Sequence, residues 1–272
     1  MPQSAFSAPG LTTATFGQDI RPDGPTSGAR FLQPQTLGSV IRNTTTIYIR
    51  NWETICLIYI LPLLPLAVLR AVLASEGHSG SAVVLFLIQT LGSILVGAAL
   101  IVAVSDICLD IKPNLRRAYR RGFANGRLFT TYFLAVLLTL FGFVLLAVPG
   151  FVLVVWYMFA LAATVLEQIS GRAALSRSRE LGRGFNWRNF GILITCSLIV
   201  SVLMAASGAL MGVSEYLILG HGYQMLENIL SEALSIVLFG PLISIPVILL
   251  YYDMRARKEG YGAAQLVEDM HI

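Results

Sequence analysis

Long apolar stretches constrain this chain more than any other feature. One of them, from Leu128 to Leu166, is about twice the length of the others and is interrupted at Pro149-Gly150. About 20 apolar residues in a helix cross the hydrocarbon layer of a bilayer, and Pro-Gly is typical of turns. The double stretch is therefore interpreted as two helices. We predict six spans, at about 54–74, 82–105, 128–148, 150–166, 190–213 and 233–252.

The composition agrees with a membrane protein and excludes several other classes. Of the 272 residues, 56% are hydrophobic and 12% are charged, whereas soluble domains carry about 25% charged residues. Such a chain is a poor match for a disordered protein, a collagen, a secreted disulfide scaffold or a cytosolic enzyme. We therefore predict an all-α fold, a polytopic bundle of six transmembrane helices with amphipathic interfacial helices on its cytoplasmic side.

The basic residues predict the orientation, because Lys and Arg accumulate in cytoplasmic loops. With the N-terminus inside, all but one of the 19 basic residues fall in cytoplasmic segments. The exception, Arg70, lies near the outer end of the first span, where it can extend to the outer interface or pair with Glu76. Both termini are therefore predicted to be cytoplasmic. The net charge of +4 follows from this topology, and no nucleic-acid binding is expected.

The segments that flank the spans define the rest of the predicted organisation. Residues 1–36 are rich in Gly, Pro, Ser and Thr, which predicts a disordered cytoplasmic N-terminal tail. Residues 37–258 form the membrane domain, and residues 259–272 form a short cytoplasmic C-terminal tail. The three cysteines fall near cytoplasmic helix ends and lack the spacing of metal ligands. No disulfide, metal site or cofactor is expected.

A short basic stretch precedes each outward-going span, which suggests a threefold internal repeat. Measured at Arg50, Arg121 and Arg183, the copies are 71 and 62 residues apart. Helices with arginines on one face and apolar residues on the other can lie among lipid headgroups, although the same arginines can simply satisfy the positive-inside rule. The candidate residues for binding lipid or a partner are Arg116, Arg117, Arg120 and Arg121 in the middle copy, and Arg172, Arg179 and Arg183 in the third.

Each inward-going span ends near an acidic residue, and a carboxylate at a helix C-terminus is unfavourable with respect to the helix dipole. One interpretation is an acidic ring at a cytoplasmic vestibule that binds a cation. The favoured interpretation is a set of arginine–carboxylate pairs that dock the interfacial helices onto the spans. The residues concerned are Asp106, Asp110, Glu167 and Asp253, with Arg255 beside the last.

Several motifs in the chain resemble a known membrane family. They are Pro149-Gly150-Phe151, Trp156-Tyr157-Met158-Phe159-Ala160, Arg183-Gly184 and Leu250-Tyr251-Tyr252-Asp253-Met254-Arg255. In this order they are similar to bacterial six-helix membrane proteins of the glycerophosphoryl diester phosphodiesterase membrane-domain-like type, and to related families of unknown function. The resemblance covers about Leu37 to Gly260. It implies a multi-pass protein of the bacterial inner membrane.

The resemblance does not imply a catalytic activity for this chain. In the fused enzymes of this family, the phosphodiesterase is a separate barrel domain that brings a pair of histidines and several acids. This chain has three histidines, His78, His221 and His271, and none lies near a carboxylate cluster with metal-site spacing. We therefore expect no catalytic domain and predict that the protein is not an enzyme.

Two functional hypotheses follow. The favoured one is a membrane module that scaffolds a partner protein or organises lipid, with anionic headgroups as the expected ligands, at the cytoplasmic face. The alternative is a transporter or carrier of a small or lipidic solute, because Pro62 and Pro65 in the first span and Pro241 and Pro246 in the last can break helices at a transport site. Plain kinks are the competing interpretation of these prolines. The sequence leaves substrate, partner, oligomeric state and physiological process open.

Overall fold

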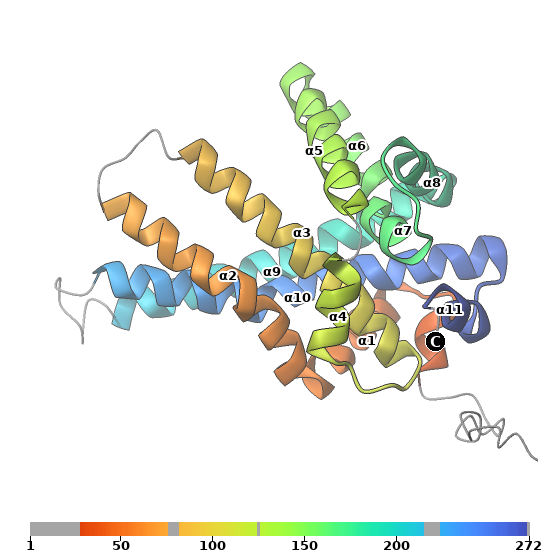
Figure 1. Ribbon diagram of the computed structural model, residues 1–272, viewed down its shortest axis with the longest axis horizontal. Coiled ribbons are helices and arrows are strands. Elements are labelled where there is room, and N and C mark those ends of the chain that lie inside the picture. The colour runs from red at the N-terminus through yellow and green to blue at the C-terminus, as the bar shows by residue number, and fades with distance from the viewer. Residues whose placement is uncertain (1–27, 76–81, 124–125, 215–223, 271–272) are drawn as a thin grey trace, which may run out of the picture.

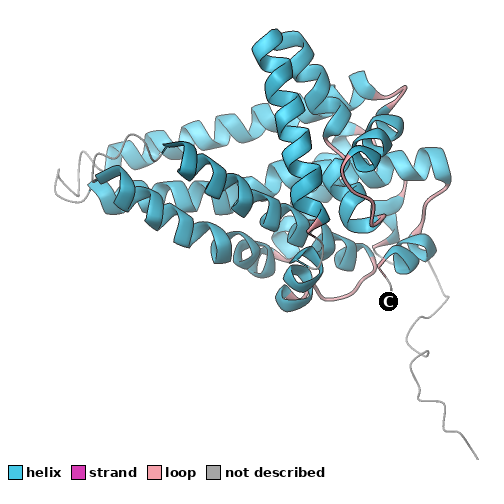
Figure 2. Cartoon of the chain, turned by 45° about the horizontal axis from the view of Figure 1, so that its top comes forward, coloured by secondary structure: helices cyan, strands magenta, loops and turns pink. Residues whose placement is uncertain are grey.

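The structure is a computed structural model that describes residues 28–75, 82–123, 126–214 and 224–270. These residues form helices and short connections, with no strand among them (Figure 2). The predicted disordered segment up to residue 27 and the three histidines lie outside the described residues. The elements in chain order are η1 Ala29–Leu32, α1 Leu37–Arg50, α2 Trp52–Ser75, α3 Ala82–Cys108, α4 Leu115–Phe123, α5 Arg127–Leu145, α6 Ala147–Tyr157, α7 Ala160–Leu166, α8 Arg172–Gly182, α9 Asn186–Ser214, α10 Gln224–Glu259 and α11 Ala263–Asp269.

The predicted all-α membrane fold is confirmed, because six helical segments are long and apolar enough to cross a bilayer. They are Trp52–Leu69, Gln89–Cys108, Arg127–Leu145, Val148–Leu166, Asn186–Leu210 and Leu234–Glu259. α2 packs against α3 and α9 against α10, and the free ends of these four helices point to the same side of the molecule (Figure 1). The α5–α6 hairpin projects in a different direction, with its tip apart from those ends.

The opposite end of the bundle carries α1, α4, α8 and α11, and we call it the basic end. α3 is the central helix, since 72% of its apolar segment is buried, whereas only 17% of the apolar segment of α5 is buried. The largest fully buried side chains include Tyr251, Tyr252 and Phe159. The core is therefore concentrated where α3, α7 and α10 meet at the basic end.

α10 is longer than the predicted span, because it begins at Gln224 and continues to Glu259. The residues beyond 252 include arginine, alanine, lysine and glutamate, which are good helix formers. The helix ends before Gly260, whose φ of +63° is a left-handed conformation that favours glycine. Asp253 therefore lies inside a helix rather than at its C-terminus, and it avoids the unfavourable end of the helix dipole.

The predicted fourth span is divided into two helices. α6 ends at Tyr157 and α7 begins at Ala160, although neither glycine nor proline occurs at the break. Ser178 of α8 stabilises this break. Its hydroxyl donates to the carbonyl of Trp156 at 2.7 Å and accepts from the amide of Phe159 at 3.1 Å. A side chain from another helix thus satisfies backbone groups that the break leaves without helical partners.

The turn between α5 and α6 is a break of one residue, Leu146, in extended conformation. The predicted boundary at Pro149-Gly150 is therefore shifted, and Pro149 lies in the first turn of α6, where a missing N–H removes no helical hydrogen bond. Gly150 permits the close approach of the two helices, since a Cβ atom there would lie 2.4 Å from the ring of Phe143. The hairpin is consequently tight.

The fold extends past both ends of the predicted 37–258 domain. Phe31 and Leu32 of η1 are buried in the core, and Gln35 is 2% exposed. Residues 28–36 therefore do not belong to a disordered tail, because two large apolar side chains anchor them. At the other end of the chain, α11 packs onto the basic end and buries Leu266 and Met270.

α2 and α10, between which the transport hypothesis expects a polar path, pack directly against each other. Both helices continue through their prolines. The hydroxyl of Tyr59 donates to Ser244 Oγ at 3.0 Å, and a Cβ atom on Gly240 would lie 2.4 Å from the ring of Tyr59. Described side chains of the two helices are therefore in close contact where that path was expected.

Candidate functional site

Asp253 is the most completely bound carboxylate at the basic end. Its side chain is 0% exposed. Arg188 Nη1 donates to one carboxylate oxygen at 2.6 Å, while Arg257 Nε and the backbone amide of Gln35 donate to the other at 2.9 and 2.6 Å. Both arginines also donate to the carbonyl of Gln35. Since a buried carboxylate needs such pairing, the cluster ties the segment before α1 to α9 and α10.

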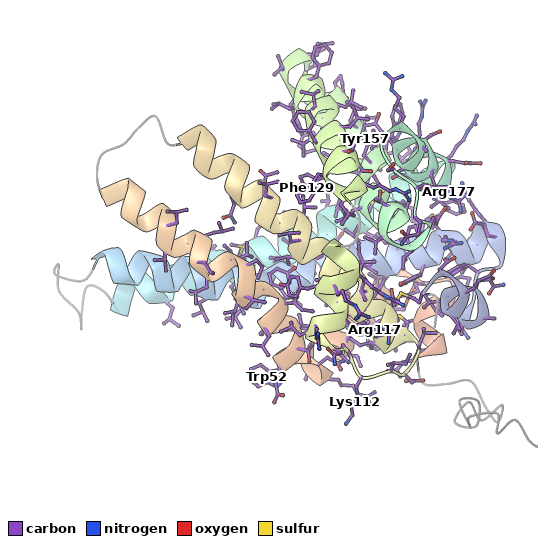
Figure 3. The ribbon with its side chains drawn as sticks, viewed as in Figure 1. Trp52, Lys112, Arg117, Phe129, Tyr157 and Arg177 are labelled. Carbon is purple, nitrogen blue, oxygen red and sulfur yellow. The ribbon has the colours of Figure 1, made fainter. Side chains whose placement is uncertain are left out.

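Glu167, which follows α7, forms a second cluster with α8 and α10. Arg177 Nε donates to one of its carboxylate oxygens and the hydroxyl of Tyr251 to the other, both at 2.7 Å. Arg177 also donates to Glu259, and Figure 3 shows it where α8 meets α7. Burial opposes the charge of Arg177, but its hydrogen bonds with Glu167 and Glu259 hold its pKa above the ordinary value.

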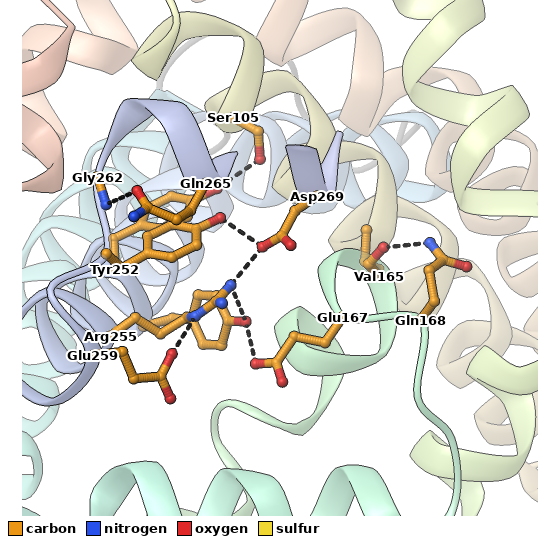
Figure 4. A network of polar contacts seen from close by, with 12 residues as sticks. Ser105, Val165, Glu167, Gln168, Tyr252, Arg255, Glu259, Gly262, Gln265 and Asp269 are labelled. Carbon is orange, nitrogen blue, oxygen red and sulfur yellow. Dashed lines mark hydrogen bonds and ion pairs between the residues drawn. The ribbon is translucent and has the colours of Figure 1, made fainter. Parts of the chain in front are cut away.

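Arg255 joins α10 to α11 (Figure 4). It donates to Glu259 at 2.9 Å and to Asp269 at 2.6 Å, and its guanidinium lies 3.7 Å from the ring centroid of Tyr261. The hydroxyl of Tyr261 donates to Asp269 at 2.7 Å, and its ring stacks on Tyr252. Arg255 therefore binds two acids that the sequence interpretation did not single out.

Asp106 is bound much less completely. Asp106 is 0% exposed and forms an ion pair of 3.6 Å with Arg117, yet neither of its oxygens accepts a hydrogen bond from any described residue. Asp110 accepts from the amide of Gly28 at 3.0 Å. It also lines a hollow of about 220 Å³ beside α1 and the connection between α3 and α4.

The acids do not form a single ring. Asp253, Glu167 and Asp106 lie in three separate clusters, each with its own arginine. In the part of the chain that the structure describes, no group of three potential metal ligands occurs. The arginine–carboxylate pairs of these clusters connect different helices.

The four arginines of α4 point in two directions rather than forming the single predicted face. Arg117 pairs with the buried acid of α3, and Arg121 contacts the sulfur of Met270 at 3.7 Å. Burial and the neighbouring charge of Arg117 lower the pKa of Arg121. Arg116 and Arg120 are exposed. Because successive residues turn by about 100° around a helix, only these two arginines face the surroundings.

Tyr119 attaches α4 to α2. Its hydroxyl donates to the carbonyl of Ile58, and burial raises the pKa of Tyr119 to about 12. The phenol therefore stays neutral and able to donate at physiological pH. The neighbouring Ala118 is 0% exposed, so the predicted apolar face of this stretch is the packed face.

α8 has the clearest outward-facing charge. Arg172, Arg179 and Arg183 are exposed, and none of them forms an ion pair with another described residue. Arg179 lies over the ring of Trp156, with its guanidinium 4.1 Å from the ring centroid. The opposite face of α8 is buried, through Ala174, Leu175, Ser178 and Leu181. α8 is therefore fixed by its buried face, and the three arginines are exposed at the basic end.

An apolar groove of about 360 Å³ lies between α6 and the start of α9, next to α8. Trp187 at its edge is 86% exposed, and the apolar segments of both helices belong to predicted spans. The groove is lined by Val148, Phe151, Val152, Val155, Trp156, Asn186, Trp187 and Phe190.

No family model, curated protein or solved structure matches the chain. The resemblance to the glycerophosphoryl diester phosphodiesterase membrane-domain-like type therefore stays a prediction from its motifs. The function has to be argued from the geometry of the basic end.

Sequence reasoning missed several residues of the clusters. Arg257 and Glu259 could have been found, because each lies four residues from a partner on the same helix, Asp253 and Arg255 respectively. Other partners carry no local signal, since their contacts join distant segments. These are Gln35, Arg177, Arg188 and Asp269.

Proposed function

We propose that this integral membrane protein is a non-enzymatic module that binds anionic phospholipids at the cytoplasmic face through Arg172 and Arg179 of α8 and Arg183 directly after it. The proposal rests on the observation that Arg172, Arg179 and Arg183 are exposed and form no ion pair with another described residue. Each basic residue near an anionic membrane surface contributes about 1 kcal/mol of attraction. In this proposal the basic end faces the cytoplasm of a bacterial inner membrane, in agreement with the positive-inside rule.

The packing of α8 supports binding over a role in topology alone. The positive-inside rule requires basic residues near the ends of the spans but no fixed arrangement. On α8 the buried face packs against α5, α6, α7 and α10, and Arg177 is used in that packing. Because the helix is held in place, its exposed arginines are pre-organised and lose less conformational entropy when they bind an anion.

The first experiment extracts the full chain from its own membrane into polymer-bounded nanodiscs and measures the co-purified lipids by mass spectrometry. The test variant replaces Arg172, Arg179 and Arg183 by Gln. A matched control removes the same charge elsewhere, by replacing the exposed Arg42, Arg116 and Arg120 with Gln. We expect anionic lipid to be enriched over the bulk membrane with the parent and the control, and not with the α8 variant.

Each other outcome overturns the proposal in its own way. An equal loss of enrichment in both variants means that the arginines act only as distributed surface charge. A protein that co-purifies in stoichiometric amount and is lost with the α8 variant, without lipid enrichment, makes the protein a scaffold. A small solute that co-purifies, with neither lipid enrichment nor a protein partner, instead supports the carrier hypothesis.

A further inference from the structure

The groove between α6 and α9 has the form of a site for one lipid chain. Its walls are the apolar side chains of the first two turns of α6 and the first turn of α9. Along α6 it runs from Val148 to Val155, about 10 Å at the rise of an α-helix. Val152 and Phe151 in these walls are 40% and 52% exposed. Both helices belong to segments that are long and apolar enough to cross a bilayer, so acyl chains are the expected neighbours of these apolar walls.

One end of the groove is polar, and the other is not. Trp156 and Asn186 line the polar end. In the amide orientation that its neighbours favour, Asn186 accepts from the indole N–H of Trp156 at 3.3 Å and donates to the carbonyl of Gly182 at 2.7 Å. Arg179 covers the ring of Trp156 from the α8 side. A positive charge therefore lies at the end of the groove that is nearest the basic end.

We propose that this groove binds one anionic glycerophospholipid, with an acyl chain along α6 between Val148 and Val155 and the phosphate beside Arg179. The inference rests on the proposed function and names its site. Charge complementarity selects the occupant: a zwitterionic lipid fills the apolar walls equally well, but only a net negative headgroup gains from Arg179 and the nearby Arg183. The exposed Glu180 on the same helix offsets part of this charge, and Arg183, which follows the helix, adds to it.

Trp156 provides a direct probe, because it lines the groove and the chain has only three tryptophans. In a Trp52→Phe/Trp187→Phe background, Trp156 is the single fluorophore. The full-length variant is reconstituted in phosphatidylcholine vesicles that contain a small fraction of lipid brominated on its acyl chain. The brominated lipid is either phosphatidylglycerol or phosphatidylcholine, at equal fractions, and the quenching of Trp156 is compared.

We expect brominated phosphatidylglycerol to quench Trp156 at several-fold lower fractions than brominated phosphatidylcholine. Each arginine that contacts the headgroup should contribute a factor of about five to this preference. Arg179→Gln should reduce this preference about fivefold. Arg116→Gln, which removes an exposed arginine of α4, should leave it unchanged. Val152→Phe, which fills the groove without changing charge, should reduce quenching by both lipids.

Equal quenching by the two lipids in the parent overturns the site, because it is the behaviour of a general lipid shell. Equal losses with Arg179→Gln and Arg116→Gln also overturn it, since the headgroup is then not held at Trp156. These failures are distinguishable from failure of the proposed function. If nanodisc enrichment depends on α8 but Trp156 shows no quenching preference, the proposed lipid-binding function holds and the groove is not the binding site. The lipid then binds elsewhere on α8.

Discussion

α4 and α8 occupy equivalent places in the chain, as short arginine-rich stretches before a predicted outward-going span, but they use their arginines differently. On α4, Arg117 and Arg121 are turned toward the protein, one toward a buried carboxylate. On α8, Arg177 alone binds both Glu167 and Glu259, and the other arginines remain exposed. The number and position of buried acids nearby thus decide which arginines hold the fold together and which are free to bind a ligand.

The largest effect is expected at Asp253, and it tests the arginines that pair with buried acids. Asp253→Ala leaves Arg188 and Arg257 without their shared carboxylate, and we expect a loss of about 3–5 kcal/mol of unfolding free energy, as for other broken buried pairs. Thermal unfolding of the purified protein in detergent measures it. Glu268→Ala, which removes an exposed acid of α11, is the control and should change little. Similar midpoints for the two variants would show that the Asp253 cluster is not structural.

A second substitution sharpens the comparison within α8 itself. Arg177→Gln removes hydrogen bonds to two carboxylates, and a loss of about 2–3 kcal/mol is expected. Arg179→Gln, two residues further on, should cost less than about 0.5 kcal/mol, because Arg179 pairs with no acid among the described residues. Both are measured by thermal unfolding under the same conditions. If Arg179→Gln is as destabilising as Arg177→Gln, the division of α8 into paired and free arginines is wrong.

Tyr119→Phe tests the docking of α4 without changing charge at neutral pH. It removes the hydrogen bond to the carbonyl of Ile58, and we expect a loss of about 1 kcal/mol. Because the folded-state pKa of Tyr119 is raised to about 12, this contribution is present below pH of about 10 and falls as the pH rises toward 12. Unfolding midpoints measured across that range should fall more steeply for the parent than for Tyr119→Phe. Parallel curves would contradict the assignment.

The smallest expected effect concerns the incompletely bound Asp106. Arg117→Gln removes its ion-pair partner at 3.6 Å, and we expect a loss of about 0.5 kcal/mol, because Arg117 is partly exposed and no hydrogen bond is broken. Arg116→Gln, on the exposed side of the same helix, should have no measurable effect. The difference in unfolding midpoint between these neighbouring substitutions reports whether α4 has one arginine face or two. Identical midpoints would favour the single face that the sequence predicts.

Much of the fold follows from the sequence, because span length and apolar composition are properties of contiguous residues. The basic stretches before α2, α5 and α9 were also predictable, since amphipathic spacing is local. The break at Tyr157 was not, because it depends on Ser178, a residue of another helix. The folding of residues 28–36 was missed for a similar reason, since its anchors Phe31 and Leu32 are buried by distant helices.

The candidate site was predicted only in part. Residue type and period correctly marked α8 as basic, and Arg172, Arg179 and Arg183 are exposed. The same reasoning could not separate Arg117 from Arg116, because their roles depend on a carboxylate in another helix. The groove beside Trp156 had no signal in the sequence. Its walls come from α6 and α9, and apolar residues in a span look the same whether they line a groove or face lipid.

The cluster around Asp253 also sets an order of events during synthesis. Its hydrogen bond to Gln35 joins residues 218 positions apart, so this contact of the segment before α1 cannot form until the ribosome has made α10. At about 5–20 residues per second, that interval of 218 residues lasts roughly 10–45 s. Throughout it, Phe31 and Leu32 can pack against α3 but lack α10, which η1 also contacts. Residues 28–36 therefore complete their packing only after α10 is made, and a membrane chaperone has this interval in which to act on them.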